Sequence, residues 1–501
     1  MPGNQHRSLS RPDLRSGSAG RLLAEQMLSR AAGAPLVDGN RVRLLRDARE
    51  NYPAWLNAIG DARRSILFEN YIIENDAVGQ RFAAALAERA RAGVSVRVVY
   101  DWFGGLGLGS ARVMRPLAEA GGEVRVFNPL WIGSPFGWMS RDHRKTLTVD
   151  GRVGYVSGLC VSSRWEGDVK RRIAPWRDTG VEITGPAVAD IERAFAQVWM
   201  TCGSPLPESA LNAASGMPRT GNVPLRVMAN QPNTAQSYRL DQLIAGLSTR
   251  SLWLTDAYYV GMATYVQALI AAARDGVDVR LLVPGASNLL AVSTLSRAGY
   301  RVLLQAGIRV FEWNGPMLHA KTAVADGRWA RVGSTNLNII SWLGNYELDV
   351  AVEDGAFAQQ MEAAYEEDLE NATEVLLSPR NRIRPVAQPE RVRGRLHGSA
   401  SRAASGAVLI GNTVRAAMTS QRMLGPVESG IMAVAGLVML ALAVVGVLWP
   451  LVVVVPLAAI CSWIALTMLV RAVLLRNKPA DNATQSDGPD RLQDDEHDQR
   501  R

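Results

Sequence analysis

The pattern His-x-Lys-x-x-x-x-Asp occurs twice in this 501-residue chain, and no other feature constrains the fold as strongly. Both copies also have a threonine after the lysine and a glycine after the aspartate. The copies comprise His143, Lys145 and Asp150 in the first and His319, Lys321 and Asp326 in the second, and these six residues are the predicted catalytic set. One copy of so short a pattern often arises by chance, whereas two extended copies in a single chain predict a duplicated domain.

Two further similarities occur in the same order in both parts of the chain. The stretch from Ala92 to Arg97 resembles Asp275 to Arg280, and Val124 to Phe127 resembles Ile308 to Phe311. Around them, apolar strand-like runs alternate with segments of helical spacing, such as Val78 to Ala92. This alternation predicts an α/β sandwich in each half.

The motif spacing indicates the chemistry. Residues two apart on a strand face the same side, so the histidine and lysine of each copy are expected to point together, with the aspartate further along. A pseudo-twofold duplication can bring the two pairs face to face in one site that suits a phosphodiester. The lysines would neutralise its oxygens, while one imidazole attacks phosphorus and the other protonates the leaving oxygen. No metal-ligand cluster is evident in the sequence, so neither a metal nor a cofactor is expected.

Each copy is followed by a turn of small residues and then by a lone carboxylate. In the second half the turn contains Ser334 and Asn336, and the carboxylates are Asp178 in the first half and Glu347 in the second. A nucleophilic imidazole needs an acceptor for its far nitrogen, and these two acids are the candidates. The alternative is that each is a surface acid in a loop.

A long uncharged stretch occupies the C-terminal part, from Ile431 to Val470. A helix of this length would span ~60 Å at ~1.5 Å per residue, about twice the hydrocarbon core of a bilayer. Two transmembrane helices with a turn at Trp449-Pro450 are therefore expected, with a buried hairpin of a soluble domain as the alternative. Basic residues on both flanks place both ends in the cytoplasm.

These signals divide the chain into seven parts. They are a flexible tail (1–35), a first half (36–201), a linker (202–224), a second half (225–378), a basic juxtamembrane linker (379–429), a transmembrane hairpin (430–471) and a flexible tail (472–501). The formal charge of +8 is modest and suits any anionic partner. The three cysteines are far apart, which argues against a disulfide framework or a zinc site.

The motifs and their surroundings resemble the phospholipase D superfamily, from about Asn40 to Leu377. Within it, Val42-Arg43-Leu44-Leu45 and Tyr52-Pro53-Ala54 look like bacterial cardiolipin synthases, especially the B type. The resemblance implies that both motifs build one shared site.

The resemblance also implies roles for the residues around the motifs. Asp178 and Glu347 match acids that orient the histidines, and Asn336 matches a site asparagine. One departure concerns the first half, where such synthases commonly read Gly-Gly-Leu-Asn but this chain reads Ser157-Gly158-Leu159-Cys160. A hydrogen bond of the first half is thereby put in doubt.

By this resemblance, phosphatidylglycerol would donate its phosphatidyl group to a histidine, and a second phosphatidylglycerol or a phosphatidylethanolamine would complete cardiolipin. The superfamily's better-understood members use the N-terminal motif as nucleophile, which implies a covalent intermediate on His143 and proton donation by His319. Asp178 would support His143 if it reached that imidazole. The protein is then expected at the bacterial inner membrane, with its catalytic body facing the cytoplasm, no nucleic-acid partner and an undetermined oligomeric state.

Three alternatives remain. A phospholipase D would pass the phosphatidyl group to water or a small alcohol. A superfamily nuclease is disfavoured by the apolar hairpin and by the aromatic run from Leu130 to Met139, which suits either a membrane interface or a loop covering the core. A non-catalytic lipid-binding protein is disfavoured because both motifs are complete.

Overall fold

The computed structural model of the chain describes residues 18–129, 140–168, 173–212 and 216–377, together with a few positions between 448 and 469. Both motifs belong to one structural unit, and a second unit contains residues 130–135 and 435–501. The described residues from 18 to 377 are called the body below. The expected hairpin and the basic linker before it lie outside the described residues, apart from those few positions. In the described part of the chain, no helix is both long and apolar enough to cross a membrane.

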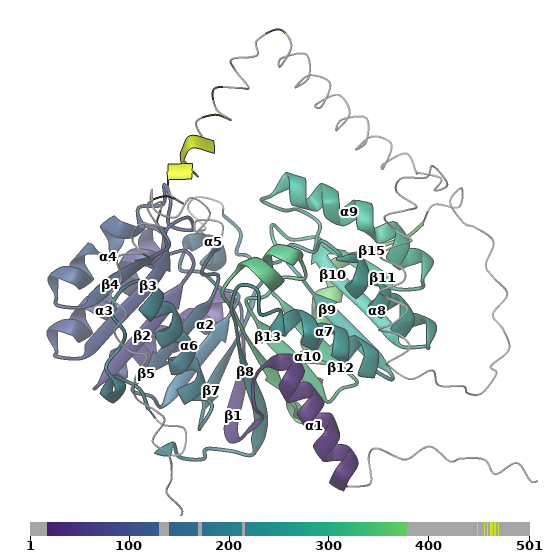
Figure 1. The fold of residues 1–501 in the computed structure, drawn as a ribbon, viewed down its shortest axis with the longest axis horizontal. Helices are drawn as coiled ribbons and strands as arrows, with labels where there is room; N and C mark the ends of the chain where they lie inside the picture. The colour runs from purple at the N-terminus through teal and green to yellow at the C-terminus, as the bar shows by residue number, and fades with distance from the viewer. Residues whose placement is uncertain are drawn as a thin grey trace, which may run out of the picture. The chain divides into compact units, whose positions relative to one another are not determined.

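The body alternates strands and helices in two series (Figure 1). The strands of the first half are β1 (Val37–Arg46), β2 (Ser65–Asn70), β3 (Ser95–Asp101), β4 (Glu123–Phe127), β5 (Lys145–Val149), β6 (Val153–Ser157) and β7 (Thr179–Thr184). Its helices are α1 (Ser18–Ala32), α2 (Asp47–Asp61), α3 (Ala77–Arg91), α4 (Ser110–Glu119), α5 (Ser163–Glu166) and α6 (Val188–Thr201).

The second half follows the same plan after a short 3-10 turn, η2 (Glu208–Ala210). Its strands are β8 (Val223–Asn230), β9 (Ser251–Thr255), β10 (Asp278–Pro284), β11 (Arg309–Trp313), β12 (Thr322–Ala325), β13 (Trp329–Gly333), β14 (Glu347–Val352) and β15 (Ala372–Val375). Its helices are α7 (Gln236–Leu247), α8 (Ala263–Arg274), α9 (Leu290–Gln305), the π-helical turn η4 (Ile340–Gly344) and α10 (Gly355–Glu370).

One 15-stranded sheet joins the halves in the order β15-β11-β10-β9-β12-β13-β14-β8-β1-β7-β6-β5-β2-β3-β4. Outward from the central β8–β1 pair, β14 corresponds to β7, β13 to β6, β12 to β5, β9 to β2, β10 to β3 and β11 to β4. Only β15 has no counterpart in this order. The strand order therefore has the pseudo-twofold symmetry expected from the duplicated sequence.

The parallel part of each half follows from its strand–helix–strand sequence. β2 and β3 pair in parallel with Ile66 opposite Val96, and β9 pairs with β10 in the same way. Parallel neighbours need a crossover, which α3 and α8 provide. The Asp76 side chain caps α3 by accepting from the backbone N–H of Gly79 at 2.9 Å. Gly93 follows the helix with φ 88°, a conformation that favours glycine.

The two motif strands, β5 and β12, lie in the middle of their halves. β5 runs antiparallel to β2, with Lys145 opposite Asn70 at the carboxyl end of that strand. β12 runs antiparallel to β9, with Thr322 opposite Thr255 at the carboxyl end of β9. The histidine end of each motif therefore lies where the parallel strands end. An apolar cluster that includes Val181, Leu225 and Val324 spans both halves and holds them together.

The expected tail at residues 1–35 is only partly described, and that part needs a correction. Ser18–Ala32 forms helix α1, which packs against α7. Ala32 is fully buried in the core of the second half together with Ala34. The Arg- and Ser-rich composition suggested a tail, but small apolar residues at the end of the segment dock it onto the body.

Candidate active site

His143, just before β5, finds its acceptor in the opposite half of the body. Its Nδ1 lies 3.0 Å from Oε2 of Glu347 and 3.2 Å from the backbone oxygen of Ser334. The His143 backbone N–H also donates to the Tyr346 oxygen at 2.9 Å. The segment that carries Glu347 therefore runs alongside the first motif.

His319 makes the reciprocal contact. Its Nδ1 lies 2.8 Å from Oδ2 of Asp178, and its backbone N–H donates to the Arg177 oxygen at 2.7 Å. The same Asp178 oxygen accepts from Trp165 Nε1 at 2.8 Å. Both acids named from the sequence thus contact an imidazole, but each contacts the one in the other half. The sequence assigns Asp178 to His143 only if it reaches that imidazole, and it does not. Isolated bridges between the halves, Arg177 with Leu318 and Asp142 with Tyr346, set each acid beside the opposite histidine.

Both carboxylates are buried and surrounded by donors. Burial alone would raise the pKa of Asp178, but the charge and hydrogen bond of His319 lower it overall. Burial would likewise raise the pKa of Glu347, but the charge and hydrogen bond of His143 lower it overall. Glu347 also accepts from Ser334 Oγ at 2.6 Å and from Ser341 Oγ. Both acids therefore stay ionised and hold the Nδ1 side of their imidazole, which assigns the chemistry to Nε2.

The two lysines face the same site from opposite halves. Burial lowers the pKa of Lys321 to about 8, so it remains largely protonated at neutral pH. Burial is the main cause that lowers the pKa of both histidines, and the charge of the lysine from the opposite half adds to it, Lys321 for His143 and Lys145 for His319. Two imidazoles and two ammonium groups therefore converge, which matches the site expected from the duplicated motif.

The two imidazoles differ in their surroundings. Burial, followed by the charge of Lys321, lowers the pKa of His319 to about 3. Each lysine donates to the backbone oxygen of its own histidine, but Lys321 Nζ also lies 2.9 Å from Nδ1 and 3.1 Å from Nε2 of the His319 ring. Aromatic rings also crowd His319 more than His143. The His319 ring centroid lies 5.1 Å from Trp165, 5.7 Å from Trp176 and 5.8 Å from Tyr258, and that of His143 lies 4.9 Å from Tyr71.

Asp150 and Asp326 need a correction, because they lie at the far ends of the motif strands. Asp150 accepts from the backbone N–H groups of residues 63–65 at 2.7 to 2.9 Å, and Asp326 does the same with residues 249–251. At ~3.3 Å per residue, Asp150 lies roughly 20 Å from His143. Both aspartates have positive φ, as does the glycine that follows each, which is the geometry of a tight hairpin turn. They shape the turn and take no part in the catalytic cluster, and their Asp-Gly sequence could have signalled this.

Asn336 of the second half is replaced by Cys160 at the matching position of the first half, as the sequence indicated. Asn336 and Cys160 are each the third residue after their strand, β13 or β6, and both are buried. Asn336 Oδ1 has no hydrogen-bond partner among the described residues. Burial raises the pKa of the Cys160 thiol while the charges of Lys145 and Lys321 oppose this, so the thiol lies within electrostatic reach of both lysines.

Several supporting residues were not predicted. Arg144, between the histidine and lysine of the first motif, is fully buried and donates to the backbone oxygens of Ala194, Asn230 and Glu347 at 2.7 to 3.2 Å. It therefore fastens the first motif to the second half. Its position is variable between the motifs, with Ala320 in the second copy, so the repeat gave no signal for it.

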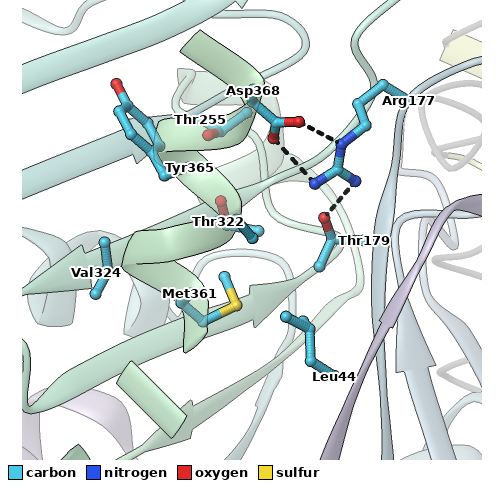
Figure 2. A pocket seen from close by; sticks show the side chains of 10 residues that line it. Leu44, Arg177, Thr179, Thr255, Thr322, Val324, Met361, Tyr365 and Asp368 are labelled. Carbon is cyan, nitrogen blue, oxygen red and sulfur yellow. Dashed lines mark hydrogen bonds and ion pairs between the residues drawn. The ribbon is translucent and has the colours of Figure 1, made fainter. Parts of the chain in front are cut away.

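A buried ion pair fixes the segment that carries Asp178. Arg177 donates to both carboxylate oxygens of Asp368 on α10, at 2.8 and 2.9 Å, and to Thr179 Oγ1 at 3.0 Å (Figure 2). These residues line a small cavity of about 10 Å³ together with Leu44 and others from both halves. The Arg177 backbone also pairs with Leu318, next to His319, so this one residue links α10 to the active site.

Asp368→Ala is expected to lower the free energy of unfolding by ~3–5 kcal/mol, because it removes the buried carboxylate from the Arg177 guanidinium and leaves only the half-exposed Asp47 at 3.2 Å. The neighbouring Glu367 pairs with Arg46 at the surface, with its side chain 59% exposed, so Glu367→Ala is the matched control and should have a small effect. Urea unfolding of both variants in detergent, followed by circular dichroism, measures the difference. Equal losses would show that the buried pair contributes no more than the surface pair.

Comparison with known proteins agrees with this geometry. Residues 243–369 match the family model described as "Cardiolipin synthase, PLD-like domain". Cardiolipin synthase A of Pseudomonas aeruginosa is 34% identical over 365 residues, covering 72% of this chain and 73% of the relative. The chain belongs to the cardiolipin synthase family. It is therefore a phosphatidyltransferase of the phospholipase D type, as the resemblance of the two motifs implied.

Other matches extend this assignment. Cardiolipin synthase 1 of Bacillus cereus is 27% identical, covering 70% of each chain. The crystal structure of phosphatidylserine synthase from Haemophilus influenzae matches with a TM-score of 0.55 at 14% identity, covering 70% of this chain and 92% of that one, which shows a shared fold. These cardiolipin synthase relatives carry the designations A and 1, so the particular likeness to the B type stays a prediction.

Proposed function

We propose that this member of the cardiolipin synthase family transfers a phosphatidyl group from phosphatidylglycerol to a second phospholipid through a phosphatidyl-histidine intermediate. The supporting observation is the pair of imidazoles, each held at Nδ1 by a buried carboxylate from the opposite half, beside two lysines. Such an arrangement provides two Nε2 atoms for one phosphodiester. The lysines would stabilise the additional negative charge of the transition state.

The proposed reaction has two balanced steps. In the first, Nε2 of one histidine attacks phosphorus, the bond from phosphorus to the glycerol headgroup breaks, and the other histidine gives its proton to the leaving oxygen. In the second, that histidine, now neutral, takes the proton from the hydroxyl of the acceptor lipid. The hydroxyl oxygen attacks phosphorus, the phosphorus–nitrogen bond breaks, and cardiolipin is released.

The unequal surroundings of the imidazoles support His319 as the nucleophile and His143 as the proton donor. A nucleophile must be neutral, and burial with Lys321 against the ring keeps the pKa of His319 at about 3. A proton donor must hold its proton. Burial also lowers the pKa of His143, but the charge and hydrogen bond of Glu347 at its Nδ1 oppose that shift. This order is opposite to the one implied by the resemblance.

Phosphatidylethanolamine is an alternative co-substrate. It would act as the phosphatidyl donor, with ethanolamine as the leaving group and the hydroxyl of phosphatidylglycerol as the acceptor, because its own headgroup has no hydroxyl. Water in place of the lipid hydroxyl as acceptor would make the enzyme a phospholipase D that yields phosphatidic acid. No described contact distinguishes these acceptors, because they would occupy the same place beside the neutral histidine. The uncharged segment at 431–470 supports a membrane anchor at the inner membrane with the body on the cytoplasmic side.

Expression in a bacterial strain that lacks cardiolipin tests the proposal. Lipid extracts should contain cardiolipin when the full chain is expressed, whereas phosphatidic acid would indicate the hydrolase and no new lipid would refute phosphatidyl transfer.

Cell fractionation in the same strain tests the anchor, since the full chain should sediment with membranes and a chain ending at Leu377 should do so less. Equal sedimentation would mean that the anchor is not needed.

A further inference from the structure

Large apolar side chains are exposed on three loops of the body that carry no charged residue. The loops are residues 102–109, 285–289 and 337–344, which come after β3, β10 and β13 in the chain. Their exposed members, here called the apolar rim, are Phe103 (49% exposed), Leu106 (55%), Leu289 (47%), Ile339 (51%) and Ile340 (65%). Single exposed apolar residues are ordinary, but a group gathered on three neighbouring loops indicates a binding surface.

The first loop is tied to His143 through Tyr71. Gly104 packs so closely on Tyr71 that a Cβ atom there would lie 2.2 Å from the Tyr71 backbone oxygen and 2.9 Å from its ring. The Tyr71 ring meets the His143 ring at a centroid distance of 4.9 Å. Phe103 and Leu106, on either side of this contact in the sequence, are therefore exposed beside the first catalytic imidazole.

The other two loops are tied to both imidazoles. Tyr258, whose ring lies 5.8 Å from that of His319, donates to Asn288 Oδ1 at 2.8 Å, one residue before Leu289. Asn338 Nδ2 donates to the Tyr258 backbone oxygen at 2.9 Å, one residue before Ile339. The Ile339–Ile340 pair is followed by Ser341, which donates to the acid that holds His143. Figure 1 shows α4 and α9, which begin after the first two loops, on the same upper side of the body.

We propose that the apolar rim is the surface with which the body enters the headgroup region of a phospholipid bilayer. The inference rests on the proposed function, because a diacyl substrate whose phosphate reaches the histidines must pass its acyl chains out of the site beside these loops. Uncharged loops with protruding Phe, Leu and Ile suit that boundary, since apolar side chains gain by leaving water and no charge is dehydrated. Both halves contribute, so the rim would hold the site against the membrane on both sides of the substrate.

The full chain carrying Leu106→Ser and Ile340→Ser tests the rim. Its kcat/KM on phosphatidylglycerol vesicles should fall by about tenfold per residue, or ~100-fold in total, because each substitution removes an apolar side chain from the bilayer. Its rate on a short-chain phosphatidylglycerol dissolved as monomers should stay unchanged. Leu247→Ser is the matched control, since Leu247 is 44% exposed at the end of α7, before β9 and at the opposite end of that strand from His319. It should change neither rate.

Unchanged vesicle activity in the double variant would overturn the proposal, and so would equal losses on both substrates, which would mean damage to the site itself.

If the unaltered chain acts on neither substrate, the proposed function fails. The apolar rim is then tested by fluorescence, which needs no turnover. A polarity-sensitive fluorophore on Leu106→Cys, with Cys202 and Cys461 replaced by serine, should shift to the blue on vesicles and be quenched by brominated lipid. The same fluorophore on Leu247→Cys should not respond. A blue shift that instead rises with protein concentration, without lipid, would assign the surface to a second copy of the chain and overturn the bilayer proposal.

Discussion

His143→Ala and His319→Ala are each expected to reduce turnover by at least ~10²–10⁴-fold, the range typical of losing a group that transfers a proton. Each variant removes one of two imidazoles that share a single phosphodiester, so neither half can compensate for the other. Steady-state transfer between vesicle lipids measures the loss. Combining the two substitutions should add little to the effect of either one, because groups that act as a unit are not additive.

Asp150→Asn and Asp326→Asn serve as the comparison, because these residues belong to the motif but accept backbone N–H groups at hairpin turns. They should lower the midpoint of unfolding more than they lower the rate of the folded enzyme. Near-normal activity in either histidine variant would mean that the two motifs do not form one site. A rate loss in the aspartate variants as large as that of the histidine variants, with an unchanged midpoint, would restore the aspartates to the catalytic group.

The sheet and its motif strands could be predicted because they depend on local patterns. The alternation of apolar strands with segments of helical spacing led to α3, which was predicted over Val78 to Ala92 and lies at Ala77–Arg91. The duplication then implied a pseudo-twofold arrangement, and the strand order has it. These features are encoded within a few tens of residues, so no knowledge of the tertiary structure is needed to find them.

The partners of the histidines could be named but not assigned, because they depend on contacts between residues far apart in the chain. Arg177 pairs with Leu318 and Asp142 with Tyr346 in isolated parallel bridges between the halves. These two bridges place Asp178 beside His319 and, in the same way, set Glu347 beside the other imidazole. An acid that follows a motif in sequence is naturally assigned to that motif, and only the pairing across the halves reverses the assignment.

The aspartates were assigned to the catalytic set because they belong to the repeated motif, although the spacing along a strand already placed them away from the histidines. A strand rises ~3.3 Å per residue, so Asp150 and His143 lie at opposite ends of the strand that joins them. The short segment before β1 shows the opposite case, because its polar composition hid a docking helix whose buried contact is Ala32. Burial of one or two small residues leaves almost no periodic signal in a sequence.

The order of the two histidines in the reaction is expected to appear as the presence or absence of a trapped intermediate. A lipid with p-nitrophenol in place of glycerol, labelled at phosphorus, has a leaving group that departs without a proton. The enzyme that lacks only the proton donor can therefore still form the intermediate, but it cannot activate the acceptor hydroxyl to resolve it. His143→Ala should release p-nitrophenolate in a burst equal to the enzyme concentration and keep the label on His319.

His319→Ala should show neither burst nor label, because the attacking atom is missing. The phosphorus–nitrogen bond breaks readily in acid, so the reaction is quenched in alkali and the labelled peptide is identified after digestion. The reverse result, with label on His143 in the His319→Ala enzyme, would restore the order implied by the resemblance. It would also mean that bound substrate removes the lowering of the His319 pKa by Lys321. A phosphate between the two lysines would draw the Lys321 ammonium group away from the ring, and the pKa of that imidazole would then rise.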